Sequence, residues 1–352
     1  MRPPRPGGLL AVAGCAALFS LLVGARLGAQ ATSENDERLT RALRQHPEAD
    51  ANQDGVLTES EARAHLRQLK SGPAGKAVKS SKAAGGPDPT LAEVHYGPHE
   101  RNVLAFWRAT SDQPAPLVVF IHGGGFVSGD KSKVRGDRIL RQCLEAGVSF
   151  AAINYRFRTA APIQDVLRDC ARAIQFLRSR AAEWNIDKSR VASFGGSAGA
   201  GTSLWLAFHD DLADPGSTDP VLRESTRLVC AAANACQFSY DILRWEELFG
   251  PAARKFDRAG EDHPAFYGLK TEAELRGPLG ARLRADCDMH GLISKDDPPV
   301  FLASPLPGGE VTDRGHLLHH PLHAKAIHDR CREVGVVCVA DVPGAGLKPA
   351  PD

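Results

Sequence analysis

Ser197 stands among glycines and alanines in the stretch SFGGSAGAGT, at positions 193–202. Residues 195–199 match the pattern G-x-S-x-G, which marks a sharp turn from a strand into a helix with the serine hydroxyl exposed at its tip. A side chain at Gly195 or Gly199 would collide with neighbouring backbone at such a turn, which explains the missing bulk. The pattern therefore predicts that Ser197 is a nucleophile for acyl transfer.

A second glycine-rich motif, HGGGF at residues 122–126, follows a run of apolar residues at 117–121. Backbone amides in such a loop, together with those at a helix N-terminus, can hold the oxyanion of a tetrahedral intermediate. The expected donors are the amides of Gly124, Gly125 and Ala198. Each motif alone is also compatible with an ordinary glycine-rich turn. Both motifs in this order favour an oxyanion site beside Ser197.

Twelve residues near the N-terminus, DANQDGVLTESE at 50–61, match the calcium loop of an EF-hand position by position. The expected ligands are oxygens of Asp50, Asn52, Asp54, the Val56 backbone, Thr58 (directly or through water) and a bidentate Glu61. Gly55 permits the sharp turn that gathers these oxygens. Residues 35–44 and 61–69 can form the flanking helices. The alternative is a solvated acidic turn between two helices. Ala62, where the family has a larger apolar residue, and the lack of a second loop predict weak binding.

The chemistry-bearing motifs lie in a region of alternating strands and helices. The predicted strands are Val103–Trp107, Leu117–Ile121, Val148–Ile153, Val191–Phe194, Leu228–Ala233, Val300–Ala303 and Val336–Val342. Residues 162–184 have apolar residues at helical spacing, and 202–208 predict another helix. This order predicts an α/β fold with a doubly wound, mostly parallel sheet over residues 91–342. Residues 237–290 break the alternation and are interpreted as an insertion or lid.

The first 31 residues have the features of a signal peptide. Arg2 and Arg5 precede an apolar run, and the residues at 29–31 are small enough for a signal-peptidase cut. A retained membrane anchor and a lipoprotein cut before Cys15 are the alternatives. We expect export to the periplasm or the extracellular space, with no stable membrane insertion after cleavage.

The composition of the rest of the chain indicates three segments, and its net charge argues against nucleic acid as a partner. A charged, helix-prone segment at 33–69 precedes a linker at 70–90 that is rich in Gly, Ser, Lys, Ala and Pro, and the large domain occupies 91–352. The formal net charge of +1 supplies no long-range field to attract nucleic acid. The cysteines beyond Cys15 lack close paired spacing, which favours buried thiols over a disulfide framework.

Residues 91–342 resemble an α/β-hydrolase of the hormone-sensitive-lipase and feruloyl-esterase-like group. The resemblance rests on YGPHERNVL, PLVVFIHGGGFVSGDKS, INYR, DCARAIQFLRSRAAEWNID, RVASFGGSAGA and DDPPVF. It implies carboxylester hydrolysis with Ser197 as the nucleophile and no cofactor for catalysis. The implied substrates are small-molecule or polysaccharide esters.

The same resemblance implies a triad acid after residues 300–303 and a histidine after the last strand. Glu310 and Asp313 are the acids near the first position, and no histidine follows the last strand. Six histidines stand between the insertion and the last predicted helix: His290, His316, His319, His320, His323 and His328. Residues 316–323 also suggest a zinc site, but Pro321 would interrupt the helix and no acidic or cysteine ligand accompanies them. A polar turn and helix start is the preferred interpretation, and no histidine is singled out as the base.

The sequence is compatible with two classes of function. One is a secreted esterase in which a displaced histidine and Glu310 or Asp313 complete the triad. The other is a hydrolase-like binding protein, or a truncated chain, that kept the pocket and lost the catalytic histidine. The intact serine turn and oxyanion loop favour the esterase.

Overall fold

A computed structural model describes residues 33, 37–45, 47–50, 56–58, 61–62, 86–256 and 263–349. The chain divides into two compact units, one of residues 26–83 and one of residues 1–25 with 84–352. The predicted signal peptide lies outside the described residues. Within the described part of the chain, no helix is both long and apolar enough to cross a membrane.

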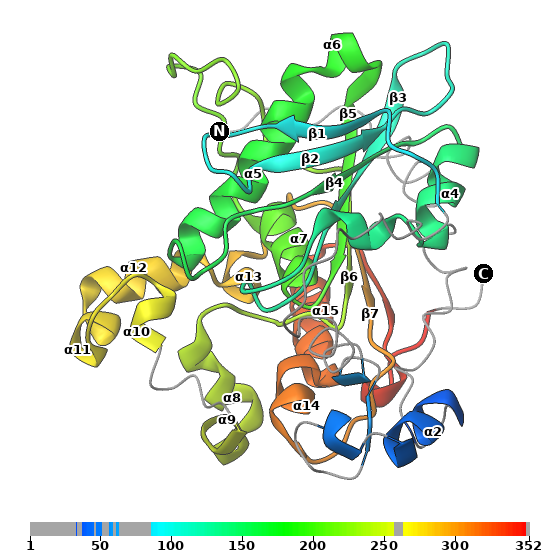
Figure 1. The fold of residues 1–352 in the computed structure, drawn as a ribbon. Helices are drawn as coiled ribbons and strands as arrows, with labels where there is room; N and C mark the ends of the chain where they lie inside the picture. Colours follow the sequence, from blue (N-terminus) through cyan, green and yellow to red (C-terminus); the bar gives the residue numbers. More distant parts are fainter. Residues whose placement is uncertain are drawn as a thin grey trace, which may run out of the picture. The chain divides into compact units, whose positions relative to one another are not determined.

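The large unit is built on one eight-stranded sheet with the order β1-β2-β4-β3-β5-β6-β7-β8 (Figure 1). The strands are β1 (Leu91–His95), β2 (Val103–Trp107), β3 (Ala115–Ile121), β4 (Ser149–Ile153), β5 (Ile186–Gly196), β6 (Cys230–Asn234), β7 (Val300–Ala303) and β8 (Cys338–Asp341). β2 runs antiparallel to β1 and β4, and the other neighbouring pairs are parallel. The predicted doubly wound, mostly parallel sheet is confirmed.

Helices connect these strands and fill the predicted insertion. The helices are α4 (Arg138–Glu145), α5 (Ile163–Ser179), α6 (Ala181–Trp184), α7 (Ala198–Phe208), α8 (Trp245–Phe249), α9 (Pro251–Phe256), α10 (His263–Phe266), α11 (Glu272–Arg276), α12 (Pro278–Asp286), α13 (Met289–Leu292), α14 (Arg314–His319) and α15 (Pro321–Val334). Short 3-10 helices occupy Lys131–Val134, Ile242–Arg244 and Pro343–Ala345. Helices α8 to α13 form the insertion between β6 and β7, and Figure 1 shows α11 and α12 away from the sheet.

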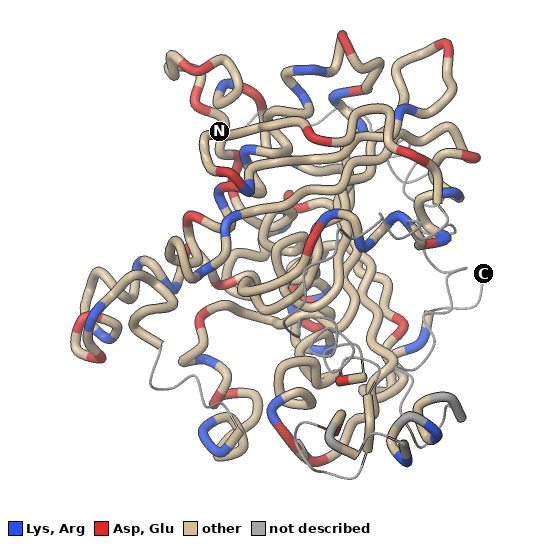
Figure 2. The backbone as a smooth tube through the Cα atoms, viewed as in Figure 1, with Lys and Arg blue, Asp and Glu red and all other residues tan. Residues whose placement is uncertain are grey.

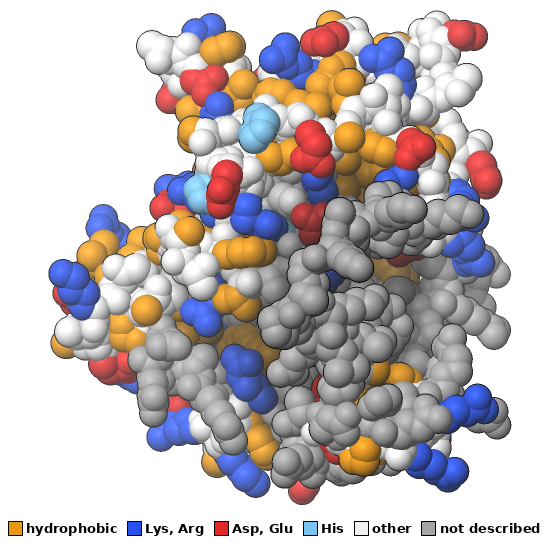
Figure 3. All heavy atoms as spheres, in the orientation of Figure 1, with side chains coloured by type: hydrophobic (Ala, Val, Ile, Leu, Met, Phe, Trp, Pro, Cys, Tyr) orange, Lys and Arg blue, Asp and Glu red, His pale blue; other side chains and the backbone are white. Residues whose placement is uncertain are grey.

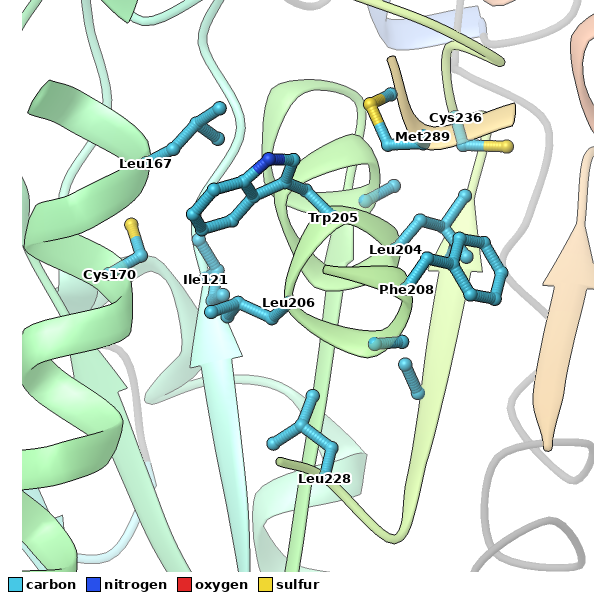
Figure 4. Close-up of a cluster of buried hydrophobic side chains, with 14 of the residues drawn as sticks. Ile121, Leu167, Cys170, Leu204, Trp205, Leu206, Phe208, Leu228, Cys236 and Met289 are labelled. Carbon is cyan, nitrogen blue, oxygen red and sulfur yellow. The ribbon is translucent and has the colours of Figure 1, made fainter. Parts of the chain in front are cut away.

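Alternate side chains along β2 to β6 enter two hydrophobic cores on opposite faces of the sheet. Leu117, Val119 and Ile121 of β3 belong to the larger core, with buried residues of α5, α7 and α15. Val118 of β3 points the other way and packs in a core with α4. Figure 4 shows Trp205 on the side of α7 that faces α5. The helix that follows Ser197 is therefore fixed within the largest core.

The N-terminal unit is described in part. Its first helix, α2 (Glu37–Gln45), is followed by a 3-10 turn at Pro47–Ala49. Leu39, Ala49 and Leu57 form a small apolar cluster. The amide of Ser33 donates to the carbonyl of Leu57 at 2.8 Å, and the amide of Leu57 donates to Ser33 Oγ at 2.9 Å.

Charges of both signs are mixed over the fold. Figure 2 shows Lys and Arg positions interspersed with Asp and Glu positions along the chain. On the face drawn in Figure 3, side chains of opposite charge lie close together among small hydrophobic areas. This mixture agrees with the formal net charge of +1.

Candidate active site

Ser197 lies on the sharp turn between β5 and α7. Its backbone has φ 54° and ψ −122°, a conformation that residues other than glycine rarely adopt. The amide of Ser197 donates to the carbonyl of Asn234, at the end of β6, over 3.0 Å. Helix α7 begins at the next residue, Ala198. The strained turn therefore places the hydroxyl at the carboxyl end of the parallel strands.

Gly195 and Gly199 are required by close backbone contacts, and both approach the carbonyl oxygen of Ile121. A Cβ added to Gly195 would lie 2.5 Å from this oxygen, and one added to Gly199 would lie 2.0 Å from it. Carbon and oxygen atoms that are not bonded do not approach so closely, so the collision expected from the sequence agrees with the structure. Gly196 differs, because its added Cβ would meet nothing nearer than 3.9 Å.

This difference predicts unequal effects of two neighbouring substitutions. Gly199→Ala is expected to destabilise the fold by about 3 kcal/mol or more, because the backbone of β3 or α7 must move. Gly196→Ala is expected to cost less than about 1 kcal/mol. Urea unfolding of both variants measures the difference, and equal stabilities would contradict this account of the turn.

The loop after β3 lies against the serine turn. Its residues Gly124, Gly125 and Phe126 have φ values of 119°, 59° and 62°, which turn successive peptides sharply. A Cβ on Gly123 would lie 2.6 Å from the carbonyl oxygen of Gly196, so the loop packs directly on the turn. Among the described residues, the amides of Gly124, Gly125 and Ala198 donate to no protein acceptor. These amides are the donors that the sequence predicted for the oxyanion.

The buried side chain of His122 supports this loop. Its ring stacks on Tyr155, with the ring centroids 4.3 Å apart. The Tyr155 hydroxyl donates to the His122 carbonyl at 2.7 Å, and His122 Nδ1 lies 2.8 Å from the carbonyl of Gly123. Burial lowers the pKa of His122 to about 4. The ring is therefore neutral at physiological pH and shapes the loop.

The histidine that meets Ser197 is His319, the last residue of α14. Its Nε2 lies 2.8 Å from Ser197 Oγ, and its Nδ1 lies 3.0 Å from the carbonyl oxygen of Gly315. A carbonyl oxygen only accepts, so the proton of the neutral ring is on Nδ1. Nε2 is then free to accept the proton of the serine hydroxyl. This is the arrangement of a serine and its general base.

The two acids suggested by the sequence lie elsewhere. Asp313 caps the N-terminus of α14: its Oδ1 accepts from the amide of His316 at 2.9 Å, and its Oδ2 accepts from the Thr312 hydroxyl at 2.9 Å. Glu310 is exposed on the loop before α14. Among the described residues, the partner of His319 Nδ1 is the Gly315 carbonyl and not a carboxylate. The structure thus brings His319 to Ser197 without either acid.

Helix α14 is held in place by side chains that bind its last carbonyls. Gln237 Nε2 donates to the carbonyl of Leu318 at 2.7 Å. His323 is fully buried, with Nε2 2.9 Å from the carbonyl of Leu317 and Nδ1 accepting from the amide of Phe238 at 3.2 Å. These bonds satisfy carbonyls that a helix C-terminus leaves without partners. They fix the end of the helix from which His319 projects.

The neighbouring histidines have structural contacts of their own. His320 is the N-cap of α15, which begins with Pro321, as the predicted turn and helix start requires. His316 Nε2 lies 3.0 Å from the carbonyl of Pro307. Within the described part of the chain, no group of three or more His, Cys, Asp or Glu residues is placed to hold a metal ion.

A cavity of about 200 Å³ opens beside Ser197. Apolar side chains from the oxyanion loop, the insertion and α14 line most of it: Phe126, Tyr240, Ile242, Trp245, Phe266 and Leu318. The Tyr240 hydroxyl donates to the carbonyl of Ala198 at 2.9 Å, which ties the cavity wall to the first residue of α7. The cavity therefore borders directly on Ser197 and on the first residue of α7.

A match to a known protein family covers the region of the oxyanion loop and the serine turn. Residues 106–228 match the model of the family described as BD-FAE, and this stretch contains both the oxyanion loop and Ser197. The domain is an α/β-hydrolase. This match agrees with the predicted resemblance over residues 106–228. The EF-hand resemblance stays a prediction, because Asn52 and Asp54 lie outside the described residues.

Relatives of the hydrolase domain include several ester hydrolases. A probable isoprenylcysteine alpha-carbonyl methylesterase of Arabidopsis thaliana is 29% identical over 136 residues, which are 38% of this chain and 28% of that protein. A probable carboxylic ester hydrolase of Mycobacterium tuberculosis is 26% identical over 216 residues, which are 60% of this chain and 46% of that protein. The chain thus spans less than half the length of these two curated relatives.

A solved structure shares the fold of the hydrolase domain. The crystal structure of an acetyl ester-xyloside bifunctional hydrolase from Caldicellulosiruptor lactoaceticus superposes with a TM-score of 0.54 and 19% identity. The superposition covers 73% of this chain and 86% of that chain. At this identity the likeness establishes the fold.

The surroundings of His319 predict how the hydrolase domain responds to pH. Burial lowers the pKa of His319 below its ordinary value, and the Gly315 carbonyl offsets part of this effect. Because a lowered pKa keeps the ring neutral into more acidic solution, kcat/KM for a neutral ester should stay level above pH 7. It should fall in acid with an apparent pKa below about 6.5. An apparent pKa above 7 would contradict a base without a carboxylate partner, provided that circular dichroism shows the protein folded at each pH.

Proposed function

We propose that this chain is a serine carboxylesterase with His319 as its general base. The observation that carries the proposal is the 2.8 Å approach of Ser197 Oγ to His319 Nε2, beside the unengaged amides of the oxyanion loop. The esterase relatives and the shared fold support the same reaction class. If the proposal is wrong, the experiment below would instead indicate a non-catalytic binding protein.

The proposed reaction begins with attack of Ser197 on the carbonyl carbon of an ester. As the Oγ–C bond forms, the hydroxyl proton passes to His319 Nε2, and the carbonyl oxygen becomes an oxyanion. The amides of Gly124, Gly125 and Ala198 stabilise that charge, and one such donor typically contributes about 3 kcal/mol. The protonated His319 then gives its proton to the leaving alcohol. Water, activated by the same Nε2, releases the acid from the acyl-serine.

The imidazolium of His319 is stabilised here by carbonyl dipoles. Its Nδ1–H donates to the Gly315 carbonyl, and its place in the last turn of α14 puts it near the negative end of the helix. A backbone carbonyl fixes the tautomer as a carboxylate would, but it carries only a partial charge. Slower turnover than that of an enzyme with a complete triad follows from this difference.

Short acyl esters fit this site best. The cavity of about 200 Å³ has room for a small acyl or alcohol group within its apolar walls. The superposed neighbour is described as an acetyl ester-xyloside hydrolase, which supports an acetyl ester on a small molecule or a polysaccharide as the substrate.

The proposed function is tested by following p-nitrophenol release from acetate, butyrate and octanoate esters. Hydrolysis of the acetate and butyrate above the rate of a Ser197→Ala protein is the expected result, with the octanoate slower. A burst equal to the enzyme concentration without turnover would show a live nucleophile and a failed deacylation step. Equal rates with the two proteins would overturn the esterase and leave the binding protein.

We also propose that the loop at residues 50–61 binds calcium. Of its expected ligands, Asp50 is buried, and Glu61 Oε2 accepts from the Thr58 amide and hydroxyl at 3.0 and 2.7 Å. Leu57 lies buried against the first helix. A bound calcium ion would contact these oxygens and link the two ends of the loop. These placements fit the oxygen ligands of an EF-hand loop.

Calcium titration of the full chain by calorimetry tests this second proposal. We expect a dissociation constant of about 10⁻⁵ M or weaker, as befits an unpaired loop. Glu61→Gln should weaken binding at least about tenfold, because a bidentate charged ligand is lost. Glu59→Gln removes the same charge at a position that supplies no ligand and should bind like the wild type. No heat at millimolar calcium would reject the site.

Export remains part of the proposed function. It rests on the basic and apolar residues at 1–23 and the small residues at 29–31. N-terminal sequencing of the protein from its host should show that the chain begins after residue 31, and an intact Met1 would reject cleavage.

A further inference from the structure

The cavity beside Ser197 carries positive charge. Arg158 and Arg314 line it, and among the described residues that form its wall there is no aspartate or glutamate. The remaining polar side chains of the wall belong to Ser197, Gln237 and His263, besides the Tyr240 hydroxyl and the Trp245 indole. An apolar cavity lined by two arginines, with no carboxylate among its described lining residues, favours an anionic ligand.

Neither guanidinium is used by the described part of the fold. Arg158 is half-buried and Arg314 is exposed, and among the described residues neither guanidinium has a hydrogen bond or ion pair. Other arginines of the domain differ: Arg156 is paired with Asp169 at 2.8 Å, and Arg284 is paired with Asp241 at 2.7 Å. A guanidinium beside an apolar cavity gains most from an anionic partner, and none of the described residues supplies one to Arg158 or Arg314.

Both arginines are anchored to the catalytic elements. The amide of Arg158 donates to the carbonyl of Phe126, in the oxyanion loop, at 2.8 Å. Arg314 is the first residue of α14, and the same helix ends with His319. Arg314 and Leu318 are separated by one helical turn and line the same cavity. A substrate held by these guanidiniums is therefore held next to the nucleophile and its base.

We propose that the natural substrate is an ester that also carries an anionic group, a carboxylate or a sulfate, bound by Arg158 and Arg314. This inference rests on the proposed esterase function and names its substrate class. The planar guanidinium binds such groups through two parallel hydrogen bonds, and its charge persists at every physiological pH. Esters on acidic sugars or on carboxylated aromatic alcohols have this chemistry.

The test compares esters of one shape that differ in charge. The anionic substrates are 4-acetoxybenzoate and 4-acetoxybenzenesulfonate, and the neutral one is 4-acetoxybenzamide, each rate being divided by its uncatalysed rate. Wild-type kcat/KM is expected to be at least about tenfold higher for an anionic ester. The better of the two anions shows whether a carboxylate or a sulfonate, which stands in for a sulfate, is the preferred group. A second pair, p-nitrophenyl hemisuccinate and p-nitrophenyl butyrate, tests whether an anionic group is preferred on the acyl side of the ester.

Substitutions assign the preference to the cavity. In Arg158→Gln and Arg314→Gln, the ratio of anionic to neutral kcat/KM is expected to fall towards one. Arg138→Gln removes the same charge from an exposed position on α4 and should keep the wild-type ratio. A ratio that is unchanged in both cavity variants would overturn the proposal.

Failure of this inference is distinguishable from failure of the esterase function. Ser197-dependent hydrolysis of the neutral ester without an anionic preference on either side of the ester would reject only the anion site. If no ester is hydrolysed, calorimetry of the Ser197→Ala protein with 4-acetoxybenzoate decides. Binding at least about tenfold tighter than that of 4-acetoxybenzamide, and lost in Arg158→Gln, supports the anion site, and equal binding of the two rejects it.

Discussion

His319→Ala is expected to lower kcat/KM for p-nitrophenyl acetate by about 10²–10⁴-fold, the usual contribution of a general base. The physical reason is the 2.8 Å contact between Nε2 and Ser197 Oγ, which no other described histidine shares. His316→Ala is the matched control, because His316 is on the same helix but contacts the Pro307 carbonyl. Steady-state kinetics at pH 8 measure both variants, and His316→Ala should stay within about threefold of the wild type.

Imidazole in solution provides a second readout for His319. It should restore part of the activity of His319→Ala, because the cavity left by the ring admits a base of the same shape. Thermal unfolding of the variant shows whether α14 remains folded. A folded His319→Ala protein with wild-type kcat/KM would contradict the assignment of the base.

Ser197→Ala is expected to have the largest effect of any single substitution, a loss of at least about 10³-fold in kcat. Residues that act as one unit have effects that do not add. The double variant Ser197→Ala with His319→Ala should therefore be no slower than Ser197→Ala alone. Additive losses in the double variant would show that the two residues act separately.

Ser193 supplies the matched control for the serine. It lies in β5, four residues before Ser197, and its buried hydroxyl has no hydrogen-bond partner among the described residues. Ser193→Ala removes the same group without leaving a partner unsatisfied, so activity and stability should hardly change. A large loss of activity in Ser193→Ala would mean that β5 tolerates no substitution. The loss of activity in Ser197→Ala could then not be assigned to the missing nucleophile.

The central sheet could be predicted from the sequence because its strands are nearly continuous apolar runs. β2 and β7 begin and end as predicted, and the others agree within a few residues, apart from β5, which starts at Ile186. β1 was missed because it is an edge strand with only Leu91 and Val94 half-buried, so its sequence LAEVH lacks an apolar run. The serine turn and oxyanion loop were predictable because glycines are required there by close backbone contacts.

The base could not be selected from the sequence. His319 was one of six candidates, and what distinguishes it is the packing of α14 against Gln237 and His323 from distant parts of the chain. One local signal was present: Asp313 caps a short helix that Pro321 prevents from continuing, which leaves His319 at its end. The acids near it in sequence were misleading, because Asp313 is used by the helix cap itself.

The most direct test of the account is covalent labelling of Ser197 by a fluorophosphonate. Attack by Ser197 Oγ forms a P–O bond and releases fluoride, and the reaction depends on the same base as ester hydrolysis. Peptide mass spectrometry of the wild type should place a single phosphonyl group on Ser197, with labelling at least about tenfold slower in His319→Ala. Labelling on another residue, or equal rates in the two proteins, would contradict a nucleophilic Ser197 activated by His319.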